Sequence, residues 1–420
     1  MKRNPNMALL KASYLFPEIN LRKRQFLVQH PAASLISLGI GDTTEPIPQS
    51  IVNSLASAST GLGTLEGYSG YGPEQGGKAL REKIASKIYS NLVQPEEVFV
   101  SDGAKCDLGR LQMLFGNDIS IAVQDPAYPV YVEGSLIQGV KEIIFMPCCP
   151  ENQFFPDLGI VPRTDLIYFC SPNNPTGAVA TRPQLENLVR FAEANHSIII
   201  FDSAYANYIQ NPSIPKSIFE IEGAKKVAIE ISSFSKLAGF TGVRLGWTVI
   251  PEELKYEDGS SVKADWNRLT STIFNGASNI AQAGGCAVLE ENGLQEISSL
   301  TKFYLENARI IKETLEDLGY EVFGGVNAPY LWVRFKGQNS WDIFQQFLDQ
   351  FHIVTTPGSG FGPAGEEYIR FTAFSHRENI LQAVARLKTH TNSSTIPTIE
   401  QKIDRLSLEN RLVVLQQRVL

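Results

Sequence analysis

Two hydroxyl groups and a guanidinium accompany one lysine in the stretch 232–247. Ser233 and Ser235 precede Lys236 by three residues and one residue, and Arg244 follows it by eight residues. Apolar runs on both sides of the stretch are typical of strands. An amine, two hydroxyls and a guanidinium can surround a phosphorylated aldehyde, which the lysine would hold through a Schiff base. Pyridoxal phosphate (PLP) is such a molecule, so the stretch suggests a PLP site.

Polar residues that follow other apolar runs would complete such a site. Asp202 ends the run 198–201, and a carboxylate there would keep the pyridine nitrogen protonated, so that the ring acts as an electron sink. Tyr205 and Asn174 could both hydrogen-bond the phenolic oxygen of the cofactor. Each residue also has a simpler explanation, because Asp and Asn are common in turns and helix caps.

A phosphate could bind at the stretch Gly103-Ala104-Lys105, which follows a predicted strand and opens a predicted helix. Backbone N–H groups and the positive end of the helix dipole favour an anion there, and Arg244 could add a charge-assisted fork. An ordinary turn between a strand and a helix explains the same three residues equally well.

Two further residues have the right chemistry for the ring and the substrate. Tyr128 follows another predicted strand and could stack on the cofactor, although a core or turn tyrosine is the alternative. Arg370 lies inside an apolar run, and a buried arginine needs an anionic partner, which the α-carboxylate of a substrate could provide. The residues are weak signals individually, but their order and spacing jointly indicate one site.

The elements that must position these residues alternate along residues 75–250. Short, continuously apolar strands separated by helices predict an α/β fold with a mostly parallel sheet buried on both faces. Ligands bind at the carboxyl ends of such strands, where the polar residues above lie. The predicted strands are 98–100, 119–123, 166–170, 198–201, 227–231 and 245–250, and the predicted helices are 78–91, 105–115 and 182–195.

The pattern changes after residue 295. A long helix over 300–318, strands over 330–334 and 368–371, and a helix over 377–387 predict a smaller α+β domain. We expect an N-terminal arm (1–45) that joins this small domain (296–390), and a large domain over 46–295. Residues 391–420 read as a linker and an amphipathic helix that packs on the body or on another chain.

Composition narrows the function classes. The formal net charge of −7 does not favour binding to nucleic acids or membrane surfaces. No apolar run approaches the roughly 20 residues that span a bilayer, and residues 1–10 lack a signal-peptide pattern, so we expect a cytoplasmic enzyme. Five scattered cysteines argue against a disulfide framework, and the cysteines and histidines lack the spacing of a metal site.

Taken together, these residues resemble the fold-type I PLP-dependent aminotransferases of the aspartate aminotransferase superfamily over roughly residues 12–390. Three longer strings, 38–46, 66–76 and 101–107, are similar to the LL-diaminopimelate aminotransferase family. The resemblance implies a large domain with a mostly parallel seven-stranded sheet flanked by helices, and a smaller α+β domain. It also implies a homodimer with shared active sites.

The resemblance assigns roles around the cofactor. It implies that Lys236 carries PLP and moves the proton, and that Asp202 pairs with the ring nitrogen. Tyr205 and Asn174 would bind the phenolic oxygen, and Tyr128 would stack on the ring. The implied phosphate and further cofactor contacts are Ala104, Lys105, Ser233, Ser235, Arg244, Asn275 and, from the neighbouring subunit, Tyr71.

The substrate residues follow from the same resemblance. Arg370 would bind the α-carboxylate, and Glu74 would meet the distal ammonium across the dimer interface. Because LL-diaminopimelate carries an amino-acid group at each end, its far end needs acceptors of both signs, which Lys105 and Glu74 would supply. The other implied contacts are Tyr14, Gly41, Tyr128, Asn174 and Asn275.

The expected reaction converts LL-2,6-diaminopimelate and 2-oxoglutarate reversibly into tetrahydrodipicolinate, glutamate and water, in lysine and meso-diaminopimelate biosynthesis. A broad-specificity aminotransferase or a PLP-dependent β-lyase would share the same cofactor shell. Ser233-x-x-Lys236 also matches the first motif of serine–lysine acyl enzymes, although neither S-D-N nor K-T-G occurs in the chain. A non-catalytic sensor with the same fold is the last alternative.

Overall fold

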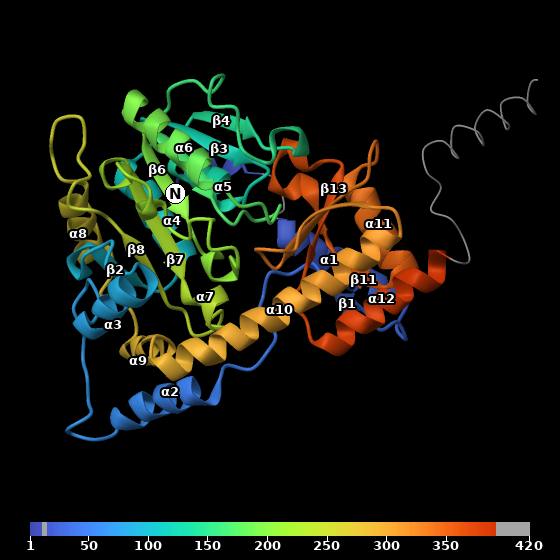
Figure 1. Ribbon diagram of the computed structural model, residues 1–420, viewed down its shortest axis with the longest axis horizontal. Helices are drawn as coiled ribbons and strands as arrows, with labels where there is room; N and C mark the ends of the chain where they lie inside the picture. Colours follow the sequence, from blue (N-terminus) through green and yellow to red (C-terminus); the bar gives the residue numbers. More distant parts are fainter. Residues whose placement is uncertain (11–14, 392–420) are drawn as a thin grey trace, which may run out of the picture.

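Seven short strands between residues 98 and 249 form one sheet in the order β2-β8-β7-β6-β5-β3-β4 (Figure 1). The computed structural model describes residues 1–10 and 15–391. Five neighbouring strands run parallel, and β8 is antiparallel to both of its neighbours. The strands are β2 (Val98–Ser101), β3 (Ser120–Asp125), β4 (Glu142–Pro147), β5 (Leu166–Cys170), β6 (Ile198–Asp202), β7 (Ala228–Ser233) and β8 (Gly246–Val249). The predicted α/β class and the mostly parallel seven-stranded sheet are confirmed.

Both faces of this sheet are buried, which explains why its strands are continuously apolar. In β5, Ile167 and Phe169 pack on one face, whereas Leu166, Tyr168 and Cys170 pack on the other. Helices cover both faces, and we call the whole assembly the large domain. Its helices are α2 (Gln49–Gly61), α3 (Lys78–Lys83), α4 (Ala104–Phe115), α5 (Val130–Gln138), α6 (Arg182–Asn195), α7 (Phe234–Leu237), α8 (Val262–Ile273) and α9 (Asn279–Val288).

Strand register brings the functional residues to one edge of the sheet. Cys170 at the end of β5 pairs with Asp202 at the end of β6, and Asp202 pairs with Ile231 of β7. Two residues further along β7, Ser233 pairs with Gly246, where the antiparallel β8 begins. The carboxyl ends of β5, β6 and β7 therefore lie side by side, and Lys236 follows directly in α7.

The small domain is built around an antiparallel sheet in the order β12-β13-β10-β9. The N-terminal segment adds α1 (Leu15–Gln29) and β1 (Ile36–Ser37), which pairs in parallel with β11. The remaining elements are β9 (Glu321–Gly324), β10 (Tyr330–Arg334), α11 (Ser340–Phe351), β11 (Ile353–Val354), β12 (Thr356–Pro357), β13 (Tyr368–Thr372), α12 (Arg377–Thr391) and the 3-10 turns η8 (Gly358–Phe361) and η9 (Pro363–Gly365).

One long helix, α10 (Glu291–Asp317), runs from the large domain to the small domain (Figure 1). Near its start, Ile297 packs in the large-domain core, whereas Ala308, Ile311 and Leu315 pack in the small-domain core. The sequence prediction placed the start of this helix at residue 300, which is nine residues late. The division at residue 295 stays a prediction, because α10 passes through that residue without a break.

The predicted helix over 78–91 is wrong in its second half. After α3, the backbone forms a π-helix over Ile84–Ile88, and Ser90 and Asn91 adopt left-handed conformations with φ of 49° and 64°. Residues in that conformation cannot continue a right-handed helix. The predicted linker and amphipathic helix beyond Thr391 lie outside the described residues, as does Tyr14.

Candidate active site

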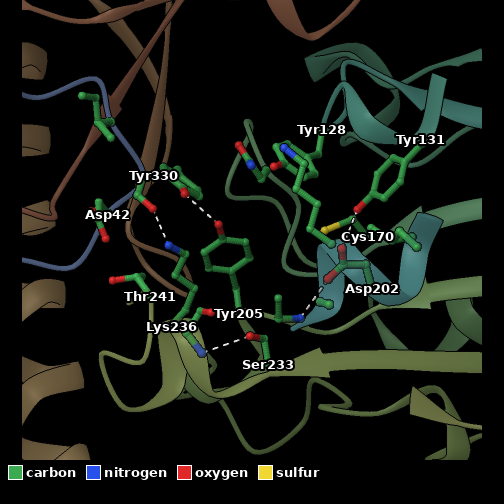
Figure 2. Close-up of a pocket in the computed structure, with 18 of the residues that line it drawn as sticks. Asp42, Tyr128, Tyr131, Cys170, Asp202, Tyr205, Ser233, Lys236, Thr241 and Tyr330 are labelled. Atoms are coloured by element: carbon green, nitrogen blue, oxygen red, sulfur yellow. Dashed lines mark hydrogen bonds between the residues drawn. The ribbon is translucent and has the colours of Figure 1, made fainter. Parts of the chain in front are cut away.

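A cavity of about 370 Å³ lies where the strand ends of the large sheet face the small domain (Figure 2). The large domain contributes Asp202 and Lys236, and the small domain contributes Tyr330 and Arg370. The N-terminal segment closes a further side with Gly41. Parallel α/β sheets bind ligands at this edge, so the position of the cavity agrees with the general rule for the fold.

Lys236 extends from α7 into the cavity. Its ammonium donates a hydrogen bond to the backbone carbonyl of Gly41 and lies 5.5 Å from the centre of the Phe374 ring. The protein around the side chain shields it from water, which lowers the pKa of the lysine to about 8, and Arg370 and Arg244 lower it further, while Asp42 opposes the shift. About a tenth of Lys236 is therefore a neutral, nucleophilic amine at pH 7, and about half at pH 8.

Asp202 lines the cavity from the end of β6. Its carboxylate accepts a hydrogen bond of 2.8 Å from the hydroxyl of Tyr131 and one of 3.0 Å from the backbone N–H of Ala204. Both donors are neutral, so neither balances a negative charge at this depth. Burial accordingly raises the pKa of Asp202. A cation bound against this carboxylate would restore its ionised form.

A second chain of contacts joins the two domains at the cavity wall. The hydroxyls of Tyr205 and Tyr330 lie 2.7 Å apart, so one donates to the other. Arg370 donates to the side-chain oxygen of Asn174 at 2.6 Å and to the carbonyl of Gly39 at 2.5 Å. The guanidinium of Arg370 also faces the ring of Tyr330 at 4.4 Å. The arginine is thus fixed in orientation while its charge remains in the wall of the cavity.

The end of the cavity near α4 gathers donors suited to an anion. Gly103 caps α4 with a φ of 129°, and a side chain at this position would collide with the guanidinium of Arg244. Arg244 reaches the hydroxyl of Ser235 at 3.5 Å, and the N–H of Ser235 donates to the hydroxyl of Ser233 at 3.0 Å. A helix N-terminus, a guanidinium and two hydroxyls together form a phosphate site.

The residues present fit PLP. The neutral Lys236 amine can bond an aldehyde, the buried Asp202 carboxylate lacks a balancing cation that a protonated ring nitrogen would supply, and the α4 end suits a phosphate. The ring of Tyr128, with the Lys105 ammonium 5.7 Å from its centre, forms part of the cavity wall between these points. Each of the three ends of the cofactor therefore has a chemically matched group.

The structure brings most of the predicted site residues together. Those that line the cavity are Gly41, Ala104, Lys105, Tyr128, Asn174, Asp202, Tyr205, Ser233, Ser235, Lys236, Arg244 and Arg370. Tyr71, Glu74 and Asn275 are exposed and do not line it; Tyr71 is 89 % exposed. These three lie in one region, because Gly276 packs against the backbone of residues 73–74.

Several cavity residues were not predicted from the sequence. Tyr131 binds Asp202, Tyr330 binds Tyr205, and the exposed Asp42 acts electrostatically on Lys236. For Tyr131 a signal existed, because it is a second tyrosine only three residues after Tyr128, and the structure places the two ring centres 6.1 Å apart. Tyr330 offered no such signal, since its partner lies 125 residues away in the chain.

The serine–lysine alternative finds no support in the geometry. The hydroxyl of Ser233 bonds the carbonyl of Leu245 and the N–H of Ser235, while Lys236 bonds the carbonyl of Gly41. A serine nucleophile needs its base within hydrogen-bond reach. Over residues 1–10 and 15–391, no cluster of His, Cys, Asp and Glu side chains is arranged to hold a metal ion.

Comparisons with known proteins agree with this site. Residues 33–387 match the family model "Aminotransferase class I and II". The chain is 58% identical over 398 residues to a probable LL-diaminopimelate aminotransferase, chloroplastic, of Oryza sativa subsp. japonica, covering 92% of this chain and 86% of the relative. It is 53% identical over 410 residues to the LL-diaminopimelate aminotransferase of Protochlamydia amoebophila (strain UWE25), covering 95% and 100% of the two chains.

A solved structure gives the same result. The L,L-diaminopimelate aminotransferase from Chlamydomonas reinhardtii is 56% identical and superposes with a TM-score of 0.90, covering 93% of this chain and 98% of the other. A coverage of 93% of this chain means that the match extends over both domains. The chain therefore belongs to the class I and II aminotransferase family and, within it, to the LL-diaminopimelate aminotransferases.

Proposed function

We propose that this protein transfers an amino group from LL-2,6-diaminopimelate to 2-oxoglutarate. The keto product cyclises and loses water, so that the products are tetrahydrodipicolinate, glutamate and water, and the reaction is reversible. The observation that carries the proposal is the meeting of Lys236, Asp202 and Arg370 in one cavity, in a chain whose relatives bear this name. The reaction would belong to lysine and meso-diaminopimelate biosynthesis.

PLP, when bound, supplies an electron sink for the electrons left when the substrate α-carbon loses its proton. Lys236 is the group that would remove this proton from the α-carbon and deliver it to C4′ of the cofactor. The pKa of this lysine is lowered to about 8, close to the working pH, and a base with such a pKa is suited to both accepting and returning a proton. Because the carbonyl of Gly41 accepts a hydrogen bond from this amine, the lysine has a defined resting orientation.

The proton on the ring nitrogen would be held by Asp202. Tyr131 donates to one oxygen of this carboxylate and the Ala204 N–H donates to the other, so the carboxyl plane is fixed. Burial strengthens an ion pair between Asp202 and a protonated nitrogen, because little water competes for either charge. Tyr205 and Asn174 line the same cavity, and we assign them to the phenolic oxygen.

The substrate α-carboxylate would bind Arg370. The contacts of this guanidinium with Asn174 and Gly39 hold its plane, so a carboxylate can bind with little loss of side-chain freedom. The phosphate would bind the first turn of α4 at Ala104 and Lys105, together with Ser233, Ser235 and Arg244. Tyr128 would stack on the ring between these two anion sites.

We also propose that the working form is a homodimer. Tyr71, Glu74 and Asn275 are exposed in one region away from their own cavity, which is consistent with a role in the site of a second copy. There Tyr71 would contact the phosphate, and Glu74 would accept the distal ammonium of the substrate while Lys105 accepts its distal carboxylate. Tyr14 and Gly41 are assigned to the same substrate.

The location in the cell remains a prediction. In the described part of the chain, none of the helices combines the length and apolar character needed to cross a membrane. Two of the plant relatives are named as chloroplastic proteins. The location to be tested is therefore the cytoplasm, as predicted from the sequence, against the chloroplast. Fluorescent tagging of the full chain in its own cell separates them.

A substrate panel tests the proposed reaction. Purified enzyme loaded with PLP should convert LL-diaminopimelate with 2-oxoglutarate, with glutamate and tetrahydrodipicolinate formed in equal amounts. Aspartate and aromatic amino acids test the broad-specificity alternative, and cystathionine tests the β-lyase alternative, in which keto acid and ammonia would appear without glutamate. Equal or faster turnover of any of these substrates would contradict the proposal. Comparing LL- with meso-diaminopimelate then measures stereochemical preference.

A further inference from the structure

The small-domain loop 358–365 contacts the large domain directly after strand β3. The backbone N–H of Ala364 donates to both carboxylate oxygens of Asp125, at 3.2 and 3.1 Å. Two residues along from Asp125, the N–H of Ala127 donates to the carbonyl of Phe361 at 2.9 Å. The two segments are therefore joined by hydrogen bonds that run in opposite directions, and we call this pair of contacts the β3–loop contact.

The β3–loop contact is closely packed around a buried charge. Asp125 is only 4 % exposed, although it lies outside the cavity and touches none of the groups assigned to catalysis. Gly362 adopts a φ of 134°, and a side chain there would collide with the Asp125 carboxylate. A carboxylate can thus approach the backbone of the loop because residue 362 has no Cβ.

Residues of the active site lie on both sides of this contact. On the large-domain side, Tyr128 follows Asp125 by three residues, and the carbonyl of Pro126 accepts a hydrogen bond of 3.1 Å from Asn173, the neighbour of Asn174. On the small-domain side, the ring of Phe361 lies 4.8 Å from the guanidinium of Arg370. The loop therefore reaches Arg370 of β13 through the ring of Phe361, while its hydrogen bonds hold it against the segment that carries Tyr128.

We propose that Asp125 is a positioning residue, which holds loop 358–365 against the end of β3 and so places Arg370 for the carboxylate of the substrate. The proposal rests on the function proposed above. It differs from the roles of Lys236 and Asp202 in cofactor binding, because those residues lie in α7 and at the end of β6. Burial raises the pKa of Asp125 to about 6, so at pH 8 the residue is ionised and its hydrogen bond to Ala364 is charge-assisted.

Two substitutions test this from opposite sides of the contact. Asp125→Asn keeps the shape but removes the charge, and Gly362→Ala keeps the charge but pushes the loop away. At pH 8 in the PLP-loaded enzyme, each should raise the KM for 2-oxoglutarate and the dissociation constant of glutarate, an unreactive dicarboxylate, by about tenfold. PLP absorbance should remain, and kcat should fall much less than KM rises. The double variant should fall short of the product of the single effects, because both disrupt one contact.

Asp165→Asn is the matched control. Asp165 accepts a hydrogen bond of 2.7 Å from the N–H of Ser120 at the other end of β3, away from the cavity. The Asp165→Asn substitution should lower the melting temperature and leave the glutarate affinity unchanged. Unchanged glutarate affinity in PLP-loaded Asp125→Asn, or an equal loss in Asp165→Asn, would overturn the positioning role. Failure of the wild-type enzyme to transaminate would count instead against the proposed function, because glutarate binding is measured without turnover.

Discussion

At the scale of single residues, Lys236 must be a neutral amine inside a cavity built to receive anions. Shielding from water and the positive charges of Arg370 and Arg244 disfavour its ammonium form, whereas Asp42 favours that form. The two arginines that would bind the substrate and the phosphate therefore also lower the pKa of Lys236 and favour its neutral form. One arrangement of charges serves both binding and proton transfer.

The pH dependence of PLP capture follows from this balance. Only the neutral amine attacks an aldehyde, so the rate at which apoenzyme takes up PLP should rise about tenfold per pH unit and level off near pH 8. Because Asp42 raises the pKa of Lys236, Asp42→Asn should move the midpoint to lower pH. Stopped-flow absorbance measures the rate of PLP uptake by the wild-type apoenzyme and by Asp42→Asn at each pH. A midpoint near 10.5, the ordinary lysine value, would contradict the interpretation.

The lowered pKa of Lys236 also affects the stability of the folded protein, and the pH dependence has the opposite sign from that of a salt-bridged lysine. The folded-state pKa of Lys236 lies below its unfolded value, so between about pH 8 and 10.5 the unfolded chain binds more protons. Stability of the apoenzyme from this group should therefore rise with pH across that window. Below pH 8 both states are protonated and the contribution is constant.

Removal of the amine gives the sharpest test of its role. Lys236→Ala should lose covalently attached PLP and at least about 10²- to 10⁴-fold in turnover, the usual contribution of a proton-transfer group. Borohydride reduction followed by peptide mass mapping should label Lys236 in the wild-type enzyme and no lysine in the variant. The exposed Lys78, replaced by alanine, is a suitable control and should leave both signals unchanged. Normal turnover by Lys236→Ala would exclude the mechanism.

Residue types and order allowed much of the cavity to be predicted, for an identifiable reason. Asp202, Ser233 and Asn174 follow continuously apolar strands, and a parallel sheet brings such positions together whatever the rest of the fold. Tyr330 was missed because its role is defined by a partner, Tyr205, rather than by a place in the chain. A tyrosine that starts an apolar strand is indistinguishable in the sequence from a core tyrosine.

At the scale of elements, the amino end of α4 depends on the absence of a side chain at Gly103. Gly103 has a positive φ, and the guanidinium of Arg244 occupies the space that a Cβ at this position would need. Gly246, the first residue of β8, also lies against it, since an added Cβ would be 2.8 Å from the Gly103 Cα. Two glycines from different elements thus allow α4, β8 and Arg244 to converge on one phosphate-sized space.

Gly103→Ala should weaken PLP binding without removing any group assigned to it. Displacement of Arg244 and backbone strain together should cost about 1–3 kcal/mol, or roughly 5- to 150-fold in the PLP dissociation constant. Gly109→Ala on the same helix is the matched control, because an added Cβ there meets no atom within 4 Å. The control should bind PLP normally and gain up to about 1 kcal/mol of stability. Equal PLP affinity in both variants would contradict the assignment of the phosphate site.

Element boundaries were predictable where local and tertiary signals agree. β5 and α6 coincide with their predicted ranges because an apolar run or a capped amphipathic pattern ends at the same residues as the packing. The prediction of a helix over 78–91 was wrong in its second half. The π-helix and the left-handed conformations of Ser90 and Asn91 depend on tertiary packing, which cannot be read from the spacing of apolar residues. The start of α10 was missed because its first turns face a different core from its later ones.

At the scale of the whole molecule, the three exposed residues Tyr71, Glu74 and Asn275 imply that one chain does not complete its own site. Mixing inactive variants tests this. Lys236→Ala and Tyr71→Ala homodimers should each be severely impaired. After random subunit exchange, one of the two sites in each mixed dimer regains both residues, so about a quarter of wild-type activity should return.

Sizing chromatography with differently tagged chains must first demonstrate that mixed dimers form. A mixture of two variants that both carry Lys236→Ala serves as the control and should remain inactive. If mixed dimers are present without recovered activity, the shared-site proposal is wrong. Recovery that requires mixing would in addition place Tyr71 in the site of the other subunit.

Helix α10 has one more consequence. Its 27 residues form a rod roughly 40 Å long, embedded in the large-domain core at one end and in the small-domain core at the other. Such a rod acts as a lever: a tilt of about 5° at its first turns displaces the far end by roughly 3 Å, about the length of one hydrogen bond. Because Lys236 belongs to the large domain and Arg370 to the small domain, a tilt of this size would also change the distance between the two side chains.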